Sequence, residues 1–414
     1  MRVRKTIVAA LVLAMTAATA LTGCGGGGSE SNTTADGKAK IRFASWDTAE
    51  DVDRQQKLVD QFNAEHDDIE VTLEAYGSEF DTKISAGMGS GDAPDVMYMW
   101  DYPSYSGGLE PLDSYIEQEG EEYKSNFYDT LWAYNSLDGT TYGIPVGFTT
   151  HCLFYNKDLF AQAGVAEPTA DWTWDDLQAA AKQISEKVDG VKGFSFQMKP
   201  DPYDFEMYFW SNGGAYVDQD GNLDGVLNSE ASVEAVKLFQ DMEKDGYAVA
   251  TEQSGTDEFR AGQTAMYVYG SWAIDSLNSD GLNYGVVPIP AFAGQGASKS
   301  ILSSSGVAIS KDSKNKEAAW EFVKFWTSEE MNRERIGLEL PVLYSVVESE
   351  GIMEQPEYAP FYTMLEQSDG TTPASFLIDN WSELRDSLSL AFERVYNPSA
   401  MEDPKTVLDE TAMQ

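Results

Sequence analysis

The alternation of apolar and polar residues near the start of the chain predicts three strands separated by helices. Residues 41–44 and 69–74 alternate with the period of two expected of half-buried strands. Residues 95–99 are continuously apolar after Asp95, which is typical of a central strand covered on both faces by helices. Between the first two strands, Val52, Val59 and Phe62 lie on one face of a helix. This order predicts an α/β domain with a largely parallel sheet.

Later in the chain, apolar residues recur at the spacing of amphipathic helices and predict a second α/β unit. Thr173 is expected to cap one of these helices and Ser229 precedes another. The apolar stripes are Leu177, Ala180, Ala181 and Ile184; Val233, Val236 and Phe239; and Ala319, Phe322, Val323 and Trp326. Tryptophans and phenylalanines within such stripes are assigned to the core and excluded from any functional site.

The first residues are typical of a secretion signal followed by a lipid attachment point. Basic residues among residues 1–5 precede an uncharged apolar run from Thr6 to Leu21, which is too short for a stable membrane span. The run ends in Leu21-Thr22-Gly23-Cys24, which resembles the processing box of bacterial lipoproteins. The resemblance implies removal of residues 1–23 and attachment of lipid to Cys24, with fatty acids such as palmitate. Residues 24–39 read as a flexible tether. The resemblance to lipoproteins implies that the protein is held by this lipid on the extracellular face of the cytoplasmic membrane.

Length and charge limit the classes of function. A chain of 414 residues exceeds the size at which one core stops growing, so two domains are expected. Its 28 basic and 69 acidic residues give a formal net charge of −41. This charge argues against nucleic acid as a partner, and against adhesion to an anionic membrane through surface charge.

Cysteine and histidine are too scarce to favour a metal centre or a thiol enzyme. Once Cys24 is lipidated only Cys152 remains, so an intramolecular disulfide is excluded. Its neighbour His151 would point to the opposite face of a strand. No phosphate-binding loop, Gly-x-Ser-x-Gly or His-Glu-x-x-His motif is present in the sequence. We therefore expect no metal, no cofactor and no enzymatic activity.

Several short motifs, taken in order, resemble the extracellular solute-binding proteins of bacterial ABC importers, specifically their carbohydrate-binding branch. They include Gly91-Asp-Ala-Pro-Asp95-Val, Tyr142-Gly-Ile-Pro145, Phe154-Tyr-Asn-Lys-Asp158, Gly270-Ser-Trp272-Ala and Ala308-Ile-Ser310. Each motif is weak alone, but their number and order behind a lipoprotein signal support the resemblance.

The resemblance implies a type II periplasmic-binding-protein-like fold, in which two α/β lobes enclose a ligand cleft and the chain crosses the hinge three times. The crossings are expected near Val146–Thr149, Gly262–Met266 and Val307–Asp312. One lobe would combine residues 40–147 with 267–307, and the other 148–266 with 312–414.

Candidate ligand-binding residues follow from the chemistry of a neutral sugar, which offers C–H faces to aromatic rings and hydroxyls to carboxylates. Aromatic residues placed just past strand ends, rather than inside helical stripes, are the candidates. Trp46 and Asp47 follow the first predicted strand, and Trp100 and Asp101 follow the third. Trp272 lies in Gly-Ser-Trp, and Trp381 begins a late helix.

The resemblance strengthens part of this set and adds to it. Trp272, Trp381 and Tyr203 fall where carbohydrate-binding relatives stack aromatic rings on sugars, and Trp46 matches a cleft position. Where relatives have a cleft carboxylate this chain has Thr149, and Glu79 is a candidate to replace that carboxylate. Trp210 and His151 remain open between cleft and core.

Three functions stay under consideration. The favoured one is a lipid-anchored, monomeric binding protein that captures an oligosaccharide by lobe closure and delivers it to the permease of an ABC importer. The second is the same scaffold for another solute, such as a glycerol phosphate ester or a peptide, which would require basic residues in the cleft. The third is a secreted carbohydrate-active enzyme, which would release new reducing ends from glycans.

Overall fold

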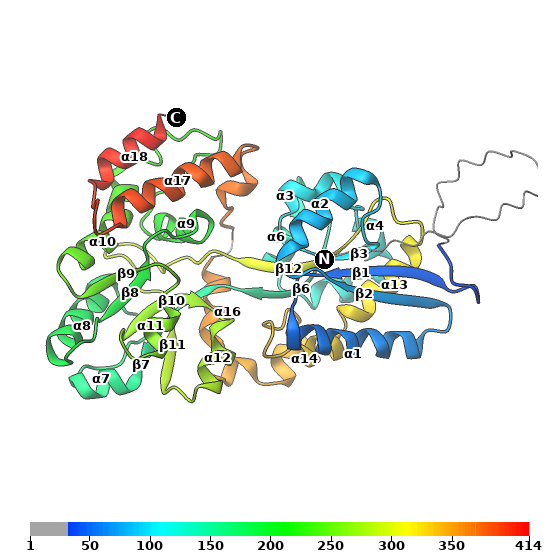
Figure 1. Ribbon diagram of the computed structural model, residues 1–414, viewed down its shortest axis with the longest axis horizontal. Helices are drawn as coiled ribbons and strands as arrows, with labels where there is room; N and C mark the ends of the chain where they lie inside the picture. The colour runs from blue at the N-terminus through cyan, green and yellow to red at the C-terminus, as the bar shows by residue number, and fades with distance from the viewer. Residues whose placement is uncertain (1–31, 369, 414) are drawn as a thin grey trace, which may run out of the picture.

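The computed structural model describes residues 32–368 and 370–413. The predicted signal peptide, Cys24 and the first part of the tether lie outside the described residues. Two α/β lobes lie side by side, joined mainly by the long strands that run between them (Figure 1). Each lobe is built around a five-stranded mixed sheet, so the α/β prediction and the two-lobed fold are confirmed.

The sheet of the first lobe has the strand order β2-β1-β3-β12-β6. β1 is parallel to β2 and β3, whereas β12 is antiparallel to β3 and β6. The strands are β1 (Ala39–Ser45), β2 (Ile69–Ala75), β3 (Val96–Met99), β6 (Ile144–Thr149) and β12 (Ser303–Ile309), with a small hairpin of β4 (Ser136–Leu137) and β5 (Thr140–Thr141) beside them. The helices are α1 (Ala49–Glu65), α2 (Phe80–Ser90), α3 (Tyr102–Tyr105), α4 (Asp113–Glu119), α5 (Glu121–Ser125), α6 (Asp129–Tyr134), α13 (Lys316–Trp326) and α14 (Glu329–Glu334).

The sheet of the second lobe has the strand order β11-β7-β10-β8-β9. β8 is parallel to β9 and β10, and β7 is antiparallel to β10 and β11. The strands are β7 (His151–Asn156), β8 (Phe194–Gln197), β9 (Ala248–Thr251), β10 (Met266–Gly270) and β11 (Tyr284–Val287). The helices are α7 (Lys157–Ala163), α8 (Trp174–Lys187), α9 (Pro202–Ser211), α10 (Glu230–Lys244), α11 (Thr256–Arg260), α12 (Ala273–Ser279), α16 (Ala359–Gln367), α17 (Trp381–Tyr396) and α18 (Pro404–Ala412).

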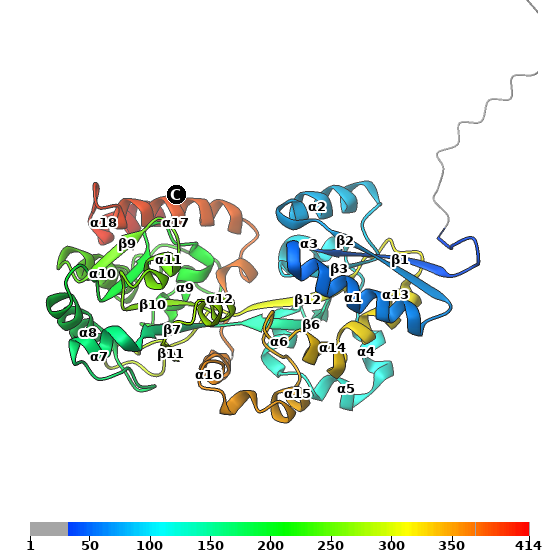
Figure 2. The same cartoon turned by 60° about the horizontal axis from the view of Figure 1, so that its bottom comes forward.

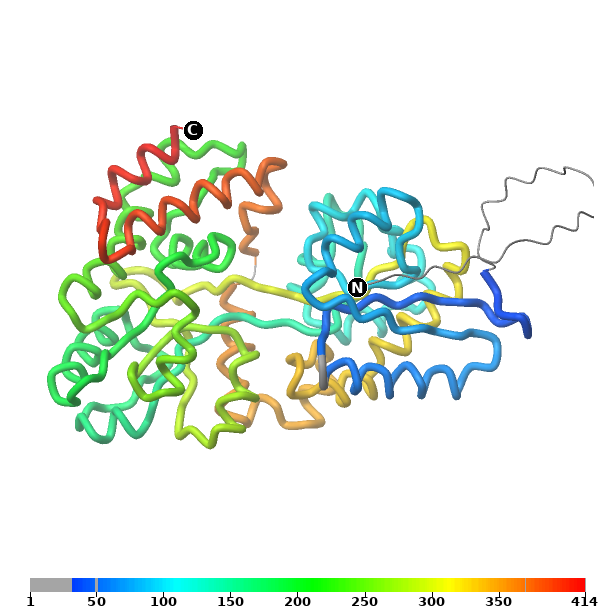
Figure 3. The backbone as a smooth tube through the Cα atoms, viewed as in Figure 1, coloured from blue at the N-terminus to red at the C-terminus, as the bar shows by residue number. Residues whose placement is uncertain are grey.

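The chain passes between the lobes at three places. It leaves the first lobe where β6 ends and β7 begins, and it returns between β11 and β12. β6 and β12 pair where they approach the second lobe, with Ser303 opposite Thr149, and they form the visible bridge in Figure 2. The last passage follows α14 through α15 (Tyr344–Ser349) to α16, drawn in orange in Figure 3.

The strand pairings correct two of the predicted hinge crossings and the lobe boundaries that followed from them. Residues 267–287 were expected in the first lobe, but β10 and β11 are hydrogen-bonded to β7 and complete the second sheet. The crossing predicted near Gly262–Met266 therefore falls inside the second lobe. The crossing predicted near Val307–Asp312 is also displaced, because α13 packs on β1 and β12 and keeps residues 316–326 in the first lobe.

The predicted strands and helical stripes are observed, and their apolar faces form the cores. Thr173 caps α8 in a capping box with Asp176, and Leu177, Ala181 and Ile184 on the same helix are buried. Trp326 is buried against Phe43 and Phe322, as expected of a residue in an apolar stripe. Among the described residues, no helix is both long and apolar enough to cross a membrane.

Candidate ligand-binding site

The two sheets present their carboxyl edges to the space between the lobes. In the first lobe, the carboxyl ends of β1, β2 and β3 lead into Trp46, Gly77 and Trp100. In the second lobe, β10 leads into Ser271 and Trp272. Ligands of open α/β sheets bind outside the carboxyl ends of strands, so this arrangement places both binding edges opposite one another.

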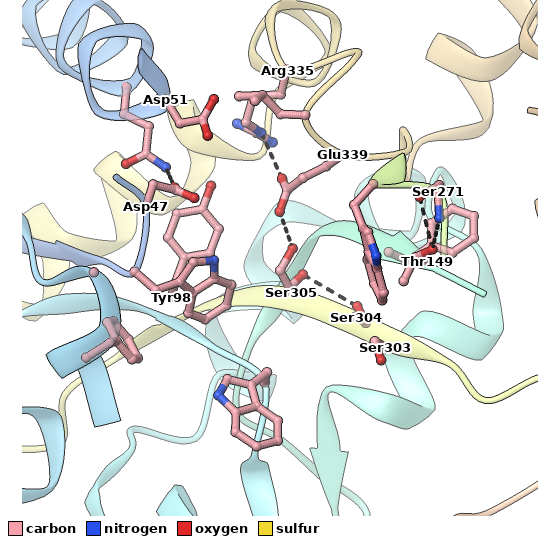
Figure 4. Close-up of a pocket in the computed structure, with 18 of the residues that line it drawn as sticks. Asp47, Asp51, Tyr98, Thr149, Ser271, Ser303, Ser304, Ser305, Arg335 and Glu339 are labelled. Carbon is pink, nitrogen blue, oxygen red and sulfur yellow. Dashed lines mark hydrogen bonds and ion pairs between the residues drawn. The ribbon is translucent and has the colours of Figure 1, made fainter. Parts of the chain in front are cut away.

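A cleft of about 520 Å³ lies between these edges. The first lobe and the hinge strands provide most of its walls, and the second lobe contributes Ser271 and Trp272. The cleft is lined by Trp46, Asp47, Asp51, Gln55, Gly77, Ser78, Phe80, Asp81, Tyr98, Trp100, Phe148, Thr149, Ser271, Trp272, Ser303, Ser304, Ser305, Arg335, Leu338 and Glu339. Its polar groups, from Asp47 on one side to Ser271 on the other, are shown in Figure 4. The volume falls within the roughly 300–1,000 Å³ of small-molecule sites.

Trp46 is positioned by two aromatic neighbours from the first lobe. Its ring lies 5.3 Å from that of Phe80 in an edge-on arrangement and 4.9 Å from that of Tyr98, measured between centroids. Tyr98 is fully buried in β3, whereas Trp46 stays half-buried. The core therefore holds one side of the indole and leaves the remainder available to the cleft.

Asp47 is a half-buried carboxylate fixed beside Trp46. It accepts hydrogen bonds from the Ser45 hydroxyl at 2.8 Å and from the side-chain amide of Gln55. Burial raises the pKa of Asp47, and hydrogen bonds from Ser45 and Gln55 oppose that effect. Because its neighbours hold its orientation, Asp47 is suited to accept a hydrogen bond from a ligand hydroxyl.

Trp272 is the main aromatic surface that the second lobe offers to the cleft. Its side chain is 47% exposed, and its indole makes edge contacts with the rings of Tyr269 and His151 at 5.2 and 5.7 Å. Gly270 makes this placement sterically feasible, because a Cβ at that position would lie 2.7 Å from the indole. The absence of a side chain at residue 270 thus lets the ring rest over the end of β10.

Thr149 connects the hinge to the segment that carries Trp272. Its hydroxyl oxygen accepts hydrogen bonds from the backbone N–H of Ser271 at 2.9 Å and from the Ser271 hydroxyl at 3.0 Å. The Thr149 hydroxyl itself donates to the carbonyl of Thr150. Thr149 lines the cleft. Its hydrogen bonds to Ser271 and Thr150 also give it a structural role, which the sequence did not indicate.

The floor of the cleft contains an ion pair that joins α14 to a hinge strand. Arg335 is 2% exposed; it donates to the carbonyl of Trp326 at 2.7 Å and lies 3.5 Å from Glu339. Glu339 in turn accepts a hydrogen bond from Ser305 of β12 at 2.5 Å. Burial raises the pKa of Glu339, while the Arg335 guanidinium opposes that shift.

The charges around the cleft are predominantly negative. Asp47, Asp51, Asp81 and Glu339 face one cationic residue, Arg335, in the cleft lining. That arginine is already paired with Glu339. The lining therefore offers hydrogen-bond acceptors to hydroxyls or cations and little to a phosphate.

Four of the predicted ligand-binding residues line the cleft, namely Trp46, Asp47, Trp100 and Trp272. Glu79 and Asp101 do not line it, although their chain neighbours do. Glu79 is exposed and forms an ion pair with Lys83 at 3.3 Å. Asp101 caps α3 by accepting the backbone N–H of Ser104. Both side chains have local structural partners instead.

The remaining predicted residues also lie outside the cleft lining. Tyr203 is half-buried and donates to the carbonyl of Leu302 at 2.8 Å. Trp210 lines a separate cavity of about 150 Å³ between α6 and α9, where its side chain hydrogen-bonds to the buried Glu206. Trp381 is half-buried, with its ring 6.4 Å from that of Tyr216. Their ligand contacts remain predictions.

Sequence reasoning missed most of the other residues that line the cleft, and two pairs of them show why. Ser78 and Asp81 follow the carboxyl end of β2, so the strand-end rule that found Trp46 and Trp100 applies to them too. Arg335 and Glu339 lie between α14 and α15, far along the chain from β1. No local pattern in the sequence marks that second pair.

Comparison with known proteins places this architecture in a family. The family model of bacterial extracellular solute-binding proteins matches residues 47–333. A Brucella abortus protein named as a binding protein is 30% identical over 346 residues, 80% of each chain. The galactooligosaccharide-binding protein of Bacillus subtilis is 25% identical, and the match covers 97% of this chain and 95% of that protein. The sn-glycerol-3-phosphate-binding protein of Brucella melitensis is also 25% identical, covering 90% and 91%.

Solved structures share the fold over nearly the whole chain. The ABC substrate-binding protein of Listeria monocytogenes, solved in complex with cycloalternan, has a TM-score of 0.77 and 26% identity. The match covers 91% of this chain and 97% of that one. Together with the two lobes and the cleft between them, these matches show that the chain belongs to the family of bacterial extracellular solute-binding proteins.

Proposed function

We propose that the protein captures an oligosaccharide in the cleft between its lobes and delivers it to an ABC importer. The observation that carries this proposal is the set of three tryptophans at the cleft. Trp46 and Trp100 come from the first lobe and Trp272 comes from the second. Flat aromatic surfaces on both sides of a cleft suit the C–H faces of sugar rings, and the nearby carboxylates and serines suit their hydroxyls.

The charge of the cleft favours a neutral sugar over a phosphate ester. A phosphate group carries close to two negative charges and is bound by unpaired arginine or lysine side chains. Among the described residues that line this cleft, Arg335 is the one cation and forms an ion pair with Glu339, and three further carboxylates line the same cleft. Binding a phosphate there would place like charges close together at a substantial cost.

Closure of the lobes provides the mechanism of capture. A ligand stacked on Trp46 or Trp100 gains further contacts only when Trp272 approaches from the other lobe. These additional contacts exist in the closed form alone, so they shift the population toward it. Removing an aromatic residue from either lobe therefore weakens binding.

Delivery to a permease and attachment to the membrane are parts of the same proposal. Lipid on Cys24 and the tether that follows would hold the monomeric protein on the extracellular face of the cytoplasmic membrane, near the importer. A Cys24→Ala variant tests the attachment, because the membrane-bound fraction is then lost to the medium while ligand binding is retained.

Calorimetric titration with a set of neutral trisaccharides tests the proposed function. The set comprises maltotriose, isomaltotriose, cellotriose and β-1,4-galactotriose. At least one should bind with a Kd of about 1 μM, or roughly −8 kcal/mol, and Trp272→Ala should weaken it at least tenfold. Trp172→Ala serves as the control, because Trp172 packs against Phe160 in the second lobe and does not line the cleft.

Two results would contradict the proposed function. Absence of binding by every trisaccharide, together with tight binding of glycerol 3-phosphate, would contradict the proposal. Release of new reducing ends from these sugars would point to an enzyme instead.

A further inference from the structure

A second, smaller cavity of about 70 Å³ lies in the second lobe beside the cleft. His151 at the start of β7, Gln197 at the end of β8 and Tyr269 near the end of β10 contribute to its walls. Because β7 is antiparallel to β10 and β8 is parallel to it, these residues share the sheet edge that leads to Trp272. The rings of His151 and Tyr269 contact the Trp272 indole directly. The cavity therefore adjoins the aromatic surface that lines the main cleft.

One carboxylate in this cavity has no hydrogen-bond or ion-pair partner among the described residues. Asp201 and Asp204 both line the cavity. Asp201 is neutralised by an ion pair with Arg385 and also caps α9 through the backbone N–H of Tyr203. Asp204, three residues further along the chain, forms neither a hydrogen bond nor an ion pair within the described parts of the chain, although the Arg385 guanidinium attracts it from a longer distance.

Aromatic residues line the same cavity as this carboxylate. The rings of Phe205 and Tyr208 from α9, Phe194 and Phe196 from β8, and Tyr269 from β10 line the cavity. Burial raises the pKa of Asp204 to about 7; the Asp201 carboxylate adds to this effect and the Arg385 guanidinium opposes it. A carboxylate and aromatic rings that face the same small space attract a cation, which gains both charge pairing and cation–π contact.

The size of the cavity limits the ligand group that it accepts. At about 70 Å³ it is much smaller than the main cleft of about 520 Å³, so we expect it to take a substituent rather than a whole sugar ring. An ammonium group is a substituent of this kind. Such a substituent would project from a sugar ring that remains stacked on Trp272 in the main cleft.

We propose that the cavity lined by Asp204 is a subsite for a protonated amine, so that the preferred ligand is an amino-substituted oligosaccharide. The proposal rests on the proposed function, since it requires that a saccharide occupies the cleft. Asp204 would pair with the ammonium group, and the neighbouring rings would exclude water from that pair.

Paired titrations test this subsite. Each of the four trisaccharides is compared with its counterpart that carries a 6-amino-6-deoxy group on the non-reducing ring, at pH 7, where a primary amine is protonated. In the unmodified protein at least one amino sugar should bind ten or more times tighter than its neutral partner. Asp204→Asn should reduce this ratio to threefold or less and leave the affinity for the neutral sugar nearly unchanged.

Two controls distinguish the loss of the Asp204 carboxylate from a general change in net charge or in folding. Asp175→Asn removes the same charge from an exposed position on α8 of the same lobe and should preserve the ratio. In the unmodified protein, carbon-13 NMR of labelled aspartate should show the Asp204 carboxyl becoming ionised when the amino sugar binds. This second measurement does not depend on the stability of the Asn variant.

The outcomes distinguish the two proposals. If neutral sugars bind but no amino counterpart binds tighter, or if Asp204→Asn keeps the preference, the amine subsite is wrong and the proposed function stands. If no member of any pair binds, the proposed function itself is contradicted, and the subsite with it.

Discussion

Individual residues explain how an aromatic ring comes to face the cleft instead of entering the core. Trp326 and Trp272 have the same side chain, but Trp326 lies in the apolar stripe of α13 and is fully buried. Trp272 follows the end of β10, where Gly270 leaves room for its indole. The distinction between stripe and strand end is visible in the sequence, which is why Trp46, Trp100 and Trp272 could be predicted.

The role of Gly270 leads to a prediction. In Gly270→Ala the new methyl group would lie within 3 Å of the Trp272 ring and displace it. We expect trisaccharide affinity to fall at least tenfold, or about 1.4 kcal/mol, with little change in melting temperature. Gly89→Ala is the matched control, since a Cβ at residue 89 meets no atom within 4 Å. Equal affinities for the two variants in calorimetry would show that the position of this ring is unimportant.

A second residue-scale prediction concerns a carboxyl buried near Trp210. Glu206 is 2% exposed, and burial raises its pKa from 4.5 to about 8. The folded protein thus keeps a proton that the unfolded chain releases, and this part of the stability is lost as the pH rises from about 5 to 8. Asp204 acts in the same direction.

Glu206→Gln removes the titrating group but keeps the shape of the side chain. Urea denaturation should show that the unmodified protein loses at least about 1 kcal/mol more of its unfolding free energy than the variant between pH 5 and 9. Parallel pH profiles for the two proteins would mean that Glu206 is ionised in the fold throughout.

At the scale of elements, short-range patterns located the strands and helices well. The alternation in residues 69–74 gives β2, and the stripe after Thr173 gives α8. The lobe to which a strand belongs could not be predicted from such patterns, because it depends on which other strand becomes its hydrogen-bonded neighbour. β10 and β11 add to β7, and no local feature of residues 266–287 indicates that choice.

The capping box of α8 provides a test at this scale. The Thr173 hydroxyl accepts the backbone N–H of Asp176, and the Asp176 carboxylate accepts the backbone N–H of Thr173. Thr173→Ala should lower the unfolding free energy by about 1 kcal/mol, whereas Thr173→Ser should preserve it because serine keeps the hydroxyl. Thermal or urea denaturation measures both, and an unchanged Ala variant would show that the cap is dispensable.

At the scale of the whole molecule, the cleft brings together residues that are remote in sequence. Arg335 and Glu339 reach it only because α13 and α14 keep the chain in the first lobe after β12. Strand ends in the sequence could therefore predict residues in the wall of the cleft, such as Trp46 and Trp100. No sequence pattern could predict Arg335 and Glu339 in its floor. Tyr203 and Trp381 belong to the second lobe, and their contact with ligand depends on how far the lobes move.

The central claim is that the lobes close on an oligosaccharide, and a distance across the cleft tests it directly. Nitroxide labels at Thr82→Cys on α2 and Glu383→Cys on α17 would occupy exposed positions in opposite lobes, and Cys152 is buried. Cys24 is replaced by alanine. Pulsed electron paramagnetic resonance should show that the distance between the two labels shortens by several ångströms when a trisaccharide that binds is added at saturation. A distance that stays the same with the sugar bound would contradict capture by closure.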